Sequence, residues 1–499
     1  MTALKLDSKL LQLTPTDFFS IRDSFEGILC LGQTGSGKTS GFGKTISGAV
    51  LRAIFGGLVL VAKPDEVDTW KQWAKEHGRQ HDLLIFDETQ GINFMEYEFA
   101  RRGVEAANSV TDTILKLLDT ANLATGQGGG KEGEKFWKDA TRQCLLYSTA
   151  CLYAAQGKVT IADIIKFVTT VPTSKPATEA EEHAFAQRFA VQLFKRFCVN
   201  PTYPPAPDMR EAVTSYFVHQ WATLADKTRS SIVISLTATL NRFTTGLLRK
   251  CFCDQTTILP ELTLAKKIIV VGIPVLTYQE DGVIANVLWK LLFQRMVDSR
   301  NGLAPQFRET PLFLYGDEMH YFTSTASDDL FLSTCRSSRC AVIAMSQSVP
   351  TFYAQMGKDK SDSVDGYLGK FGTKVFCLQA DPRTNKYAAD LIGKGLKSRK
   401  SSSVASSKGI NTNRGGTQNS AHNGFSNSES TNETIGTQEY EAYLIEPNFF
   451  ASNQLKTGSA RHQFEVSGVW FKAGANFTQP IPETNRNCIL ATFLQKGTL

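Results

Sequence analysis

Apolar residues follow two kinds of pattern along this chain. Short, mostly apolar runs, as in 27–31, 57–62 and 82–86, have the length and composition of strands buried on both faces. Between them, apolar residues recur every three or four positions, which is the spacing of an amphipathic helix. Strands that alternate with helices are typical of a parallel sheet with right-handed crossovers. The first hundred residues therefore predict an α/β domain.

After about residue 104 only helical spacing is found. Val110, Ile114 and Leu117 share one face of a predicted helix, and Phe136 and Ala140 belong to the next one. Strand-like runs return at 267–273, 311–316, 340–347 and 374–378. The pattern predicts an all-α domain inserted into an α/β domain whose sheet is mainly parallel.

The segment 397–437 consists of Ser, Asn, Thr and Gly with scattered charged residues and almost no large apolar ones. Such a segment cannot bury enough apolar surface to offset the entropy lost on ordering. We therefore predict that it is disordered, as a linker or a functional insertion. Aromatic and β-branched residues return in 438–499, which predicts strands that complete the core.

The turn after the first strand carries a glycine-rich octapeptide that ends in a lysine and a threonine. Its residues are Gly32, Gln33, Thr34, Gly35, Ser36, Gly37, Lys38 and Thr39. Strand, glycine-rich turn and helix are the context of a phosphate-binding P-loop, in which backbone N–H groups and the helix N-terminus face the phosphates. Lys38 would reach the β- and γ-phosphates, and the Thr39 hydroxyl would hold Mg²⁺. The sequence thus predicts ATP and Mg²⁺ as cofactors.

Two acids close a later strand. Asp317 and Glu318 directly follow the apolar run that begins at residue 311. In a P-loop protein, the first acid would hold Mg²⁺ through a water, and the second would orient or deprotonate the attacking water. His320 follows shortly after, but no partner Cys or His lies at zinc spacing, so we interpret it as structural.

Gln347 ends the next strand, where it could contact the γ-phosphate or the attacking water. Arg336 and Arg339 lie on the segment that leads into this strand. An arginine there could stabilise transition-state charge at a neighbouring subunit's nucleotide. A surface salt bridge is the simpler interpretation of either arginine from the sequence alone.

The composition is that of an ordinary globular protein, with 42% hydrophobic and 20% charged residues among 499. A net charge of +6 permits a nucleic-acid partner without requiring one. The ten scattered cysteines are best explained as free thiols in a reducing cytoplasm. No apolar run is long enough for a membrane span, so we expect a cytoplasmic protein without a transmembrane segment.

Four stretches resemble one family of motor ATPases. They are GQTGSGKT at 32–39, NFMEYEF at 93–99, LFLYGDEMHYF at 312–322 and RSSRCAVIAMSQS at 336–348. Their order and spacing resemble the FtsK/HerA group of RecA-like ATPases, and within it the type IV secretion coupling proteins of the TraD/TraG group. The resemblance covers the chain from about residue 20.

The resemblance implies functional roles for particular residues. Lys38 and Thr39 are the Walker A residues, and Asp317 and Glu318 the Walker B pair. Gln347 matches the γ-phosphate sensor, and Arg336 matches a proposed arginine that acts in trans. The first part of the predicted RecA-like domain is 1–103, and the all-α insertion is 104–260. The second part of the RecA-like domain is 261–396, followed by the disordered insertion 397–437 and the β-rich completion 438–499.

The family implies a hexameric ring that moves DNA, single-stranded or bound to a relaxase, towards a secretion apparatus. Relaxosome or secretion proteins are then expected partners. Most coupling proteins begin with transmembrane helices, whereas only about 25 residues precede the first core strand here. Peripheral docking onto a partner at the inner membrane and service of a transfer route from the cytoplasm therefore both stay open. Two alternatives stay open, a nucleotide-dependent adaptor with little motor activity and a DNA-packaging ATPase.

Overall fold

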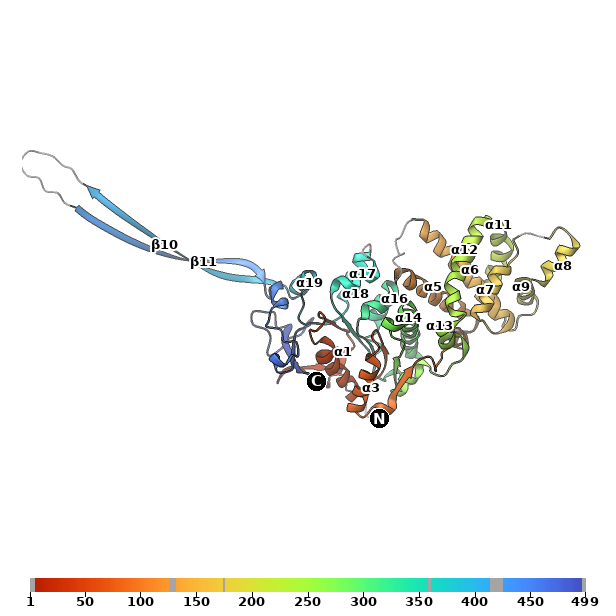
Figure 1. Ribbon diagram of the computed structural model, residues 1–499, viewed down its shortest axis with the longest axis horizontal. Helices are drawn as coiled ribbons and strands as arrows, with labels where there is room; N and C mark the ends of the chain where they lie inside the picture. Colours follow the sequence, from red (N-terminus) through yellow and green to blue (C-terminus); the bar gives the residue numbers. More distant parts are fainter. Residues whose placement is uncertain (1–4, 125–131, 174–175, 358–359, 413–424, 496–499) are drawn as a thin grey trace, which may run out of the picture.

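The computed structural model describes residues 5–124, 132–173, 176–357, 360–412 and 425–495. Figure 1 shows a central body that contains a sheet, a block of helices at one end and a long arm at the other. Among the described residues, no helix is both long and apolar enough to cross a lipid bilayer.

One nine-stranded sheet forms the centre of the body. Its strands lie in the order β13-β12-β9-β3-β8-β7-β4-β6-β5. Seven neighbouring strands from β9 to β5 run parallel, while β12 pairs antiparallel with both β9 and β13. The strands are β3 (Ile28–Leu31), β4 (Gly56–Leu60), β5 (Leu83–Phe86), β6 (Ile268–Val271), β7 (Leu312–Gly316), β8 (Cys340–Ser346), β9 (Thr373–Phe376), β12 (Glu465–Lys472) and β13 (Cys488–Leu494).

The parallel strands are apolar throughout because helices cover both faces of the sheet. In β3, Ile28 and Cys30 pack with one buried cluster, and Leu29 and Leu31 with the other. Two helices, α2 (Lys44–Arg52) and α3 (Glu66–Glu76), contribute to the cluster that contains Ile28. The opposite face is covered by α14 (Val275–Ser299), α16 (Thr325–Thr334), α17 (Val349–Met356), α18 (Ser361–Gly369) and α19 (Pro382–Ile392).

Between β5 and β6 the described residues form helices and turns only. This block packs against the sheet domain through α14, which contacts α5. Its α-helices are α4 (Phe94–Arg102), α5 (Ala106–Ala124), α6 (Glu132–Gln156), α7 (Ile161–Thr170), α8 (Glu179–Gln187), α9 (Phe189–Val199), α10 (Pro207–Ser215), α11 (Trp221–Thr223), α12 (Asp226–Leu240) and α13 (Gly246–Arg249). The predicted fold class, a RecA-like α/β core with an all-α insertion, is confirmed.

The elements at the N-terminus and before β7 are short. At the N-terminus, β1 (Lys9–Gln12) and β2 (Phe18–Ser20) form a small antiparallel pair that precedes α1 (Ile21–Ser24). A short helix, α15 (Pro305–Arg308), precedes β7.

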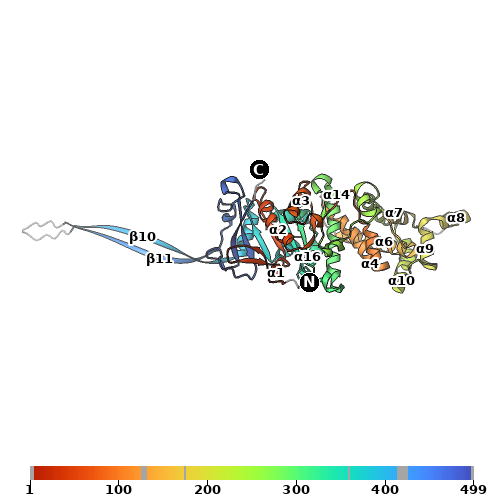
Figure 2. The same ribbon diagram turned by 90° about the horizontal axis from the view of Figure 1, so that it is seen from below.

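The prediction of a disordered insertion at 397–437 is wrong for most of that segment. Residues 397–412 and 425–437 belong to two 19-residue strands, β10 (Lys394–Thr412) and β11 (Phe425–Tyr443), which pair antiparallel. Both views show this arm projecting from the body, away from the helical block (Figures 1 and 2). The prediction considered only apolar burial, but a two-stranded ribbon is held by backbone hydrogen bonds, which need no core. Residues 413–424 lie outside the described residues.

Candidate nucleotide-binding site

The glycine-rich turn connects β3 to a π-helical turn at Lys38–Gly43, which continues into α2. Gly35 and Gly37 have φ values of +78° and +81°, a region that favours glycine. A Cβ atom on Gly37 would also lie 2.6 Å from Val466. Among the described residues, the N–H groups of Gly35 and Gly37 make no hydrogen bond. The turn therefore presents backbone donors suited to an anion.

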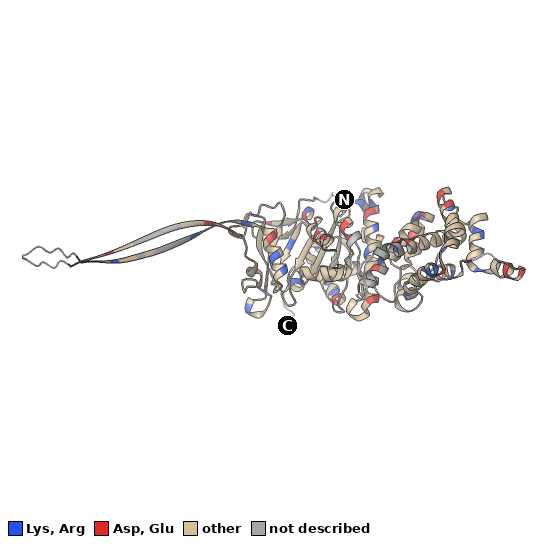
Figure 3. Ribbon diagram, turned by 90° about the horizontal axis from the view of Figure 1, so that it is seen from above, with Lys and Arg blue, Asp and Glu red and all other residues tan. Residues whose placement is uncertain are grey.

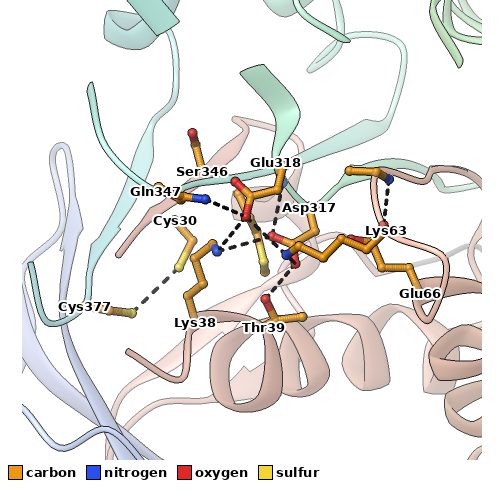
Figure 4. A network of polar contacts seen from close by, with 12 residues as sticks. Cys30, Lys38, Thr39, Lys63, Glu66, Asp317, Glu318, Ser346, Gln347 and Cys377 are labelled. Carbon is orange, nitrogen blue, oxygen red and sulfur yellow. Dashed lines mark hydrogen bonds and ion pairs between the residues drawn. The ribbon is translucent and has the colours of Figure 1, made fainter. Parts of the chain in front are cut away.

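Both Walker motifs meet at the carboxyl edge of the parallel sheet (Figure 4). The Thr39 hydroxyl donates a hydrogen bond of 2.7 Å to Oδ2 of Asp317. The Lys38 Nζ lies 3.6 Å from Asp317 Oδ1 and 3.4 Å from Glu318 Oε1. All of these side chains except Thr39 are buried. Residues 279 positions apart in sequence (317 − 38) are thus in direct contact.

This convergence follows from the topology of the sheet. One strand, β8, separates β3 from β7, and the three strands run in the same direction. Since carboxyl ends of parallel strands share one edge, the residues that follow each strand face a common space. Gln347 directly follows β8, and its amide Nε2 donates to Glu318 Oε1 at 3.3 Å.

Glu318 is held in an unusual backbone conformation, with φ of +56° and ψ of +44°. A non-glycine residue there is uncommon, and such residues cluster at functional sites. Its Oε1 accepts from Gln347 and Lys63, whereas its buried Oε2 has no hydrogen-bond partner among the described residues. The carboxylate thus keeps one oxygen free for a further donor.

Two residues that sequence reasoning missed complete the cluster. Lys63 follows β4 and places its Nζ 3.2 Å from Glu318 Oε1 and 3.6 Å from Asp317 Oδ2. Glu66 begins α3, and its Oε2 accepts from the Ala62 N–H at 2.9 Å. Their position just after a predicted strand is a signal that could have drawn attention to both.

The charges of this cluster change its protonation behaviour. Burial raises the pKa of Asp317, but the ammonium groups of Lys38 and Lys63 outweigh burial and hold that pKa below its ordinary value. Burial lowers the pKa of Lys63, but the two neighbouring acids reverse this and raise it. For Glu66, burial and the negative charge of Asp317 raise the pKa to about 8. At neutral pH Asp317 is therefore ionised, whereas Lys63 and Glu66 are protonated.

His320, which the sequence predicts to be structural, lies at the border of the cluster. Its Nδ1 is 3.0 Å from the Ser346 hydroxyl and 3.7 Å from Glu318 Oε2. Burial lowers the pKa of His320 below its ordinary value although Glu318 counteracts it, so the ring is neutral at pH 7. In the described part of the chain, no group of three or more His, Cys, Asp and Glu side chains is arranged to hold a metal ion.

The structure does not bring the two candidate arginines to this site. Arg336 precedes the amino end of β8, whereas Gln347 follows its carboxyl end, so about 20 Å separates them at 3.3 Å per strand residue. The Arg336 side chain is 65% exposed, and its NH2 lies 3.5 Å from Glu26 Oε1. Arg339 NH1 lies 3.4 Å from Glu309 Oε2. Neither arginine can reach its own chain's P-loop.

The residues present fit a nucleotide with a divalent cation. The turn offers unpaired N–H groups, Lys38 offers a cation, and the Thr39 hydroxyl with the Asp317 carboxylate offers the oxygen ligands that Mg²⁺ prefers. Ser36 Oγ is buried without a hydrogen-bond partner in the described residues, so this turn has further capacity for a polar ligand.

Fold and site together define a P-loop protein with a RecA-like core. Residues 311–439, from β7 to β11, match the model of a family described as the TraM recognition site of TraD and TraG. No protein of curated function matches the chain in sequence.

Structures of the plasmid coupling protein TrwB match the chain over nearly its whole length. Its complex with the non-hydrolysable GTP analogue GDPNP has 14% identity and a TM-score of 0.55, and covers 99% of this chain and 92% of TrwB. The TrwB complex with ADP and Mg²⁺ has the same identity and TM-score, and covers 99% of this chain and 91% of TrwB. An unbound form of this bacterial conjugative protein has 14% identity and a TM-score of 0.53, with 99% and 90% covered. The family model confirms the predicted resemblance to the TraD/TraG group over residues 311–439, and the TrwB structures confirm the fold over the chain.

Proposed function

We propose that this chain is an ATP-driven DNA translocase that delivers DNA to a conjugative or type IV secretion apparatus. The observation that carries the proposal is the position of Glu318. Its carboxylate lies beside Lys38 and Gln347 and directly follows Asp317, which accepts from Thr39. A protein that only binds nucleotide has no need of a buried acid in this position, whereas hydrolysis needs an activated water.

Each side chain has a distinct task in this proposal. Lys38 and the unpaired N–H groups of Gly35 and Gly37 would hold the phosphates, and Thr39 with Asp317 would hold the cation. Mg²⁺, when bound, neutralises charge that develops on the phosphates. Glu318 orients the attacking water and accepts its proton, and Gln347 senses the γ-phosphate through its contact with Glu318.

The proposal includes an arginine that acts in trans. Arg336 is exposed at the amino edge of the sheet, away from its own chain's P-loop, which supports a role at a neighbouring copy's nucleotide. We propose a hexameric ring in which Arg336 of each copy completes the next site. DNA would pass through its channel, and a relaxosome protein of the TraM type would contact the segment that matches the TraD/TraG family. Peripheral docking at the inner membrane is part of the same proposal.

ATP hydrolysis with and without single-stranded DNA tests the proposal. We expect DNA to stimulate hydrolysis in the unaltered chain, and Glu318→Gln to bind nucleotide without turnover in either condition. Glu182→Gln, at an exposed acid of α8 in the helical block, is the matched control and should behave as the unaltered chain. Slow hydrolysis that DNA leaves unchanged would favour the adaptor alternative.

A further inference from the structure

The arm is a two-stranded ribbon with an open edge on each side. Its register is continuous from Lys394 opposite Tyr443 to Thr412 opposite Phe425, and it pairs with no other strand of the described chain. At about 3.3 Å per residue, each strand extends roughly 60 Å. An isolated ribbon is marginally stable, and its unpaired N–H and C=O groups are a template for another strand.

The two strands carry opposite charges. The sequence of β10 contains five Lys and Arg residues and no acid, whereas β11 contains four Glu residues and no base. The body differs, since Figure 3 shows acidic and basic positions interspersed over its helices. The charge separation is therefore a property of the arm.

Ion pairs within the arm use only part of these charges. Lys408 lies 2.6 Å from Glu429, and Lys394 lies 3.8 Å from Glu441. Neither Arg399 nor Glu439 has an ion-pair partner within the described residues, and both are exposed. The arm also exposes apolar side chains, with Leu396 at 76% and Val404 at 63%. The ribbon thus keeps charge and apolar surface that its own chain leaves uncovered.

These features select one way for two arms to meet. Two β10 edges would bring basic residues together and two β11 edges acidic ones, and like charges across a ladder are destabilising. An edge of β10 beside an edge of β11 from another copy brings opposite charges together. When two arms lie side by side in the same orientation, these edges are also antiparallel, which suits an extended ladder.

We propose that the arm is an assembly surface whose partner is a second copy of this chain, with β10 of one copy pairing with β11 of the next. This contact is head-to-tail, so it repeats from copy to copy. It forms a closed ring when the rotations between successive copies add up to a full turn. In a ring, the arms then form one continuous antiparallel sheet without free edges. The inference rests on the ring assembly of the proposed function and adds a second contact between copies, away from the ATPase sites.

Chemical cross-linking between differently labelled copies tests this pairing. Ser407 on β10 and Ser430 on β11 are exposed, and their hydroxyl oxygens lie 3.1 Å apart within one arm. We would prepare Ser407→Cys and Ser430→Cys as separate chains and treat each alone, and their mixture, with a short bis-maleimide that spans one strand spacing but not the roughly 10 Å between like strands of neighbouring arms. The unaltered chain measures the background from native cysteines, and a chain with both substitutions should cross-link internally and report that the arm is formed.

Cross-linked dimers should form in the mixture and not in either single preparation. In the Ser430→Cys chain, Glu439→Lys should lower the dimer yield roughly three- to tenfold at low salt. Glu179→Lys, an exposed acid on α8, is the matched control and should leave the yield unchanged. Equal yields in the single preparations would overturn the pairing, as would no dimers in a mixture whose arms cross-link internally.

Particle mass and ATP hydrolysis of the same preparations separate this inference from the function on which it rests. If rings form and hydrolyse ATP but no cross-linked dimers appear, the arm inference alone is overturned. If neither rings nor dimers form, the ring assembly is overturned together with the arm pairing.

Discussion

Glu66→Gln should stabilise the protein in a strongly pH-dependent way. Glu66 is only 6% exposed, its Oε1 has no hydrogen-bond partner in the described residues, and the charge of Asp317 acts on it. These conditions raise its pKa to about 8 in the folded protein, from an ordinary value of 4.5. The amide keeps an oxygen that can accept from the Ala62 N–H and removes the charge.

The sign and size of the effect follow from the two pKa values. Between pH 4.5 and 8 the unfolded chain releases the Glu66 proton while the folded chain keeps it, so the free energy of unfolding falls as pH rises. At 1.36 kcal/mol per pH unit, the whole loss is about 5 kcal/mol above pH 8 and less than about 1 kcal/mol at pH 5. Glu66→Gln should remove this loss, so its advantage should grow from near zero at pH 5 to several kcal/mol at pH 9.

Urea unfolding at pH 5, 7 and 9 in nucleotide- and metal-free buffer measures this difference. Trp70 and Trp73 lie on the same helix and report its unfolding by fluorescence. Glu76→Gln on the exposed side of α3 is the matched control and should change stability by no more than about 0.5 kcal/mol at any of these pH values. Parallel pH profiles for Glu66→Gln and the unaltered chain would refute the reasoning, because they would mean that Glu66 is already ionised at pH 5.

Four further outcomes are expected. Lys38→Ala should abolish ATP hydrolysis while circular dichroism stays unchanged, and a lost spectrum would show that Lys38 serves the fold instead. Glu318→Gln should bind nucleotide normally and lower turnover about 10²- to 10⁴-fold, and turnover at the unaltered rate would remove Glu318 from its role. Arg336→Ala should bind nucleotide yet hydrolyse it poorly, and mixing it with Lys38→Ala should restore part of the activity. No recovery in rings shown to contain both variants would contradict action in trans. Replacing 397–437 with a short Gly/Ser linker should leave basal ATP hydrolysis unchanged, because no described residue of the arm contacts the site, and lost hydrolysis would contradict this.

The sequence predicted the main chemical groups of the site but not all of its residues. Lys38, Thr39, Asp317 and Gln347 each end a strand or follow one, and parallel strands bring such residues to one edge whatever their separation in the chain. Lys63 was missed because its position in the site depends on the order of the strands in the sheet. Only the position of β4 beside β7 brings this lysine to the two acids.

The arm could not be predicted from its composition. Its residues lack the apolar surface that orders a globular segment, and the sequence gives no direct sign that backbone pairing alone would align 394–412 with 425–443. The opposite charges of the two strands were visible in the sequence. These charges can be interpreted as a property of two strand edges only when the register places one strand beside the other.

Movement of DNA is the central claim, and displacement of a roadblock tests it most directly. The chain would be incubated with ATP, Mg²⁺ and single-stranded DNA that carries streptavidin on a terminal biotin, and the release of the streptavidin would be followed over time. We predict release that requires ATP and is absent with Glu318→Gln, although this variant still binds DNA and nucleotide. ATP hydrolysis stimulated by single-stranded DNA without any release of the streptavidin would contradict a translocase.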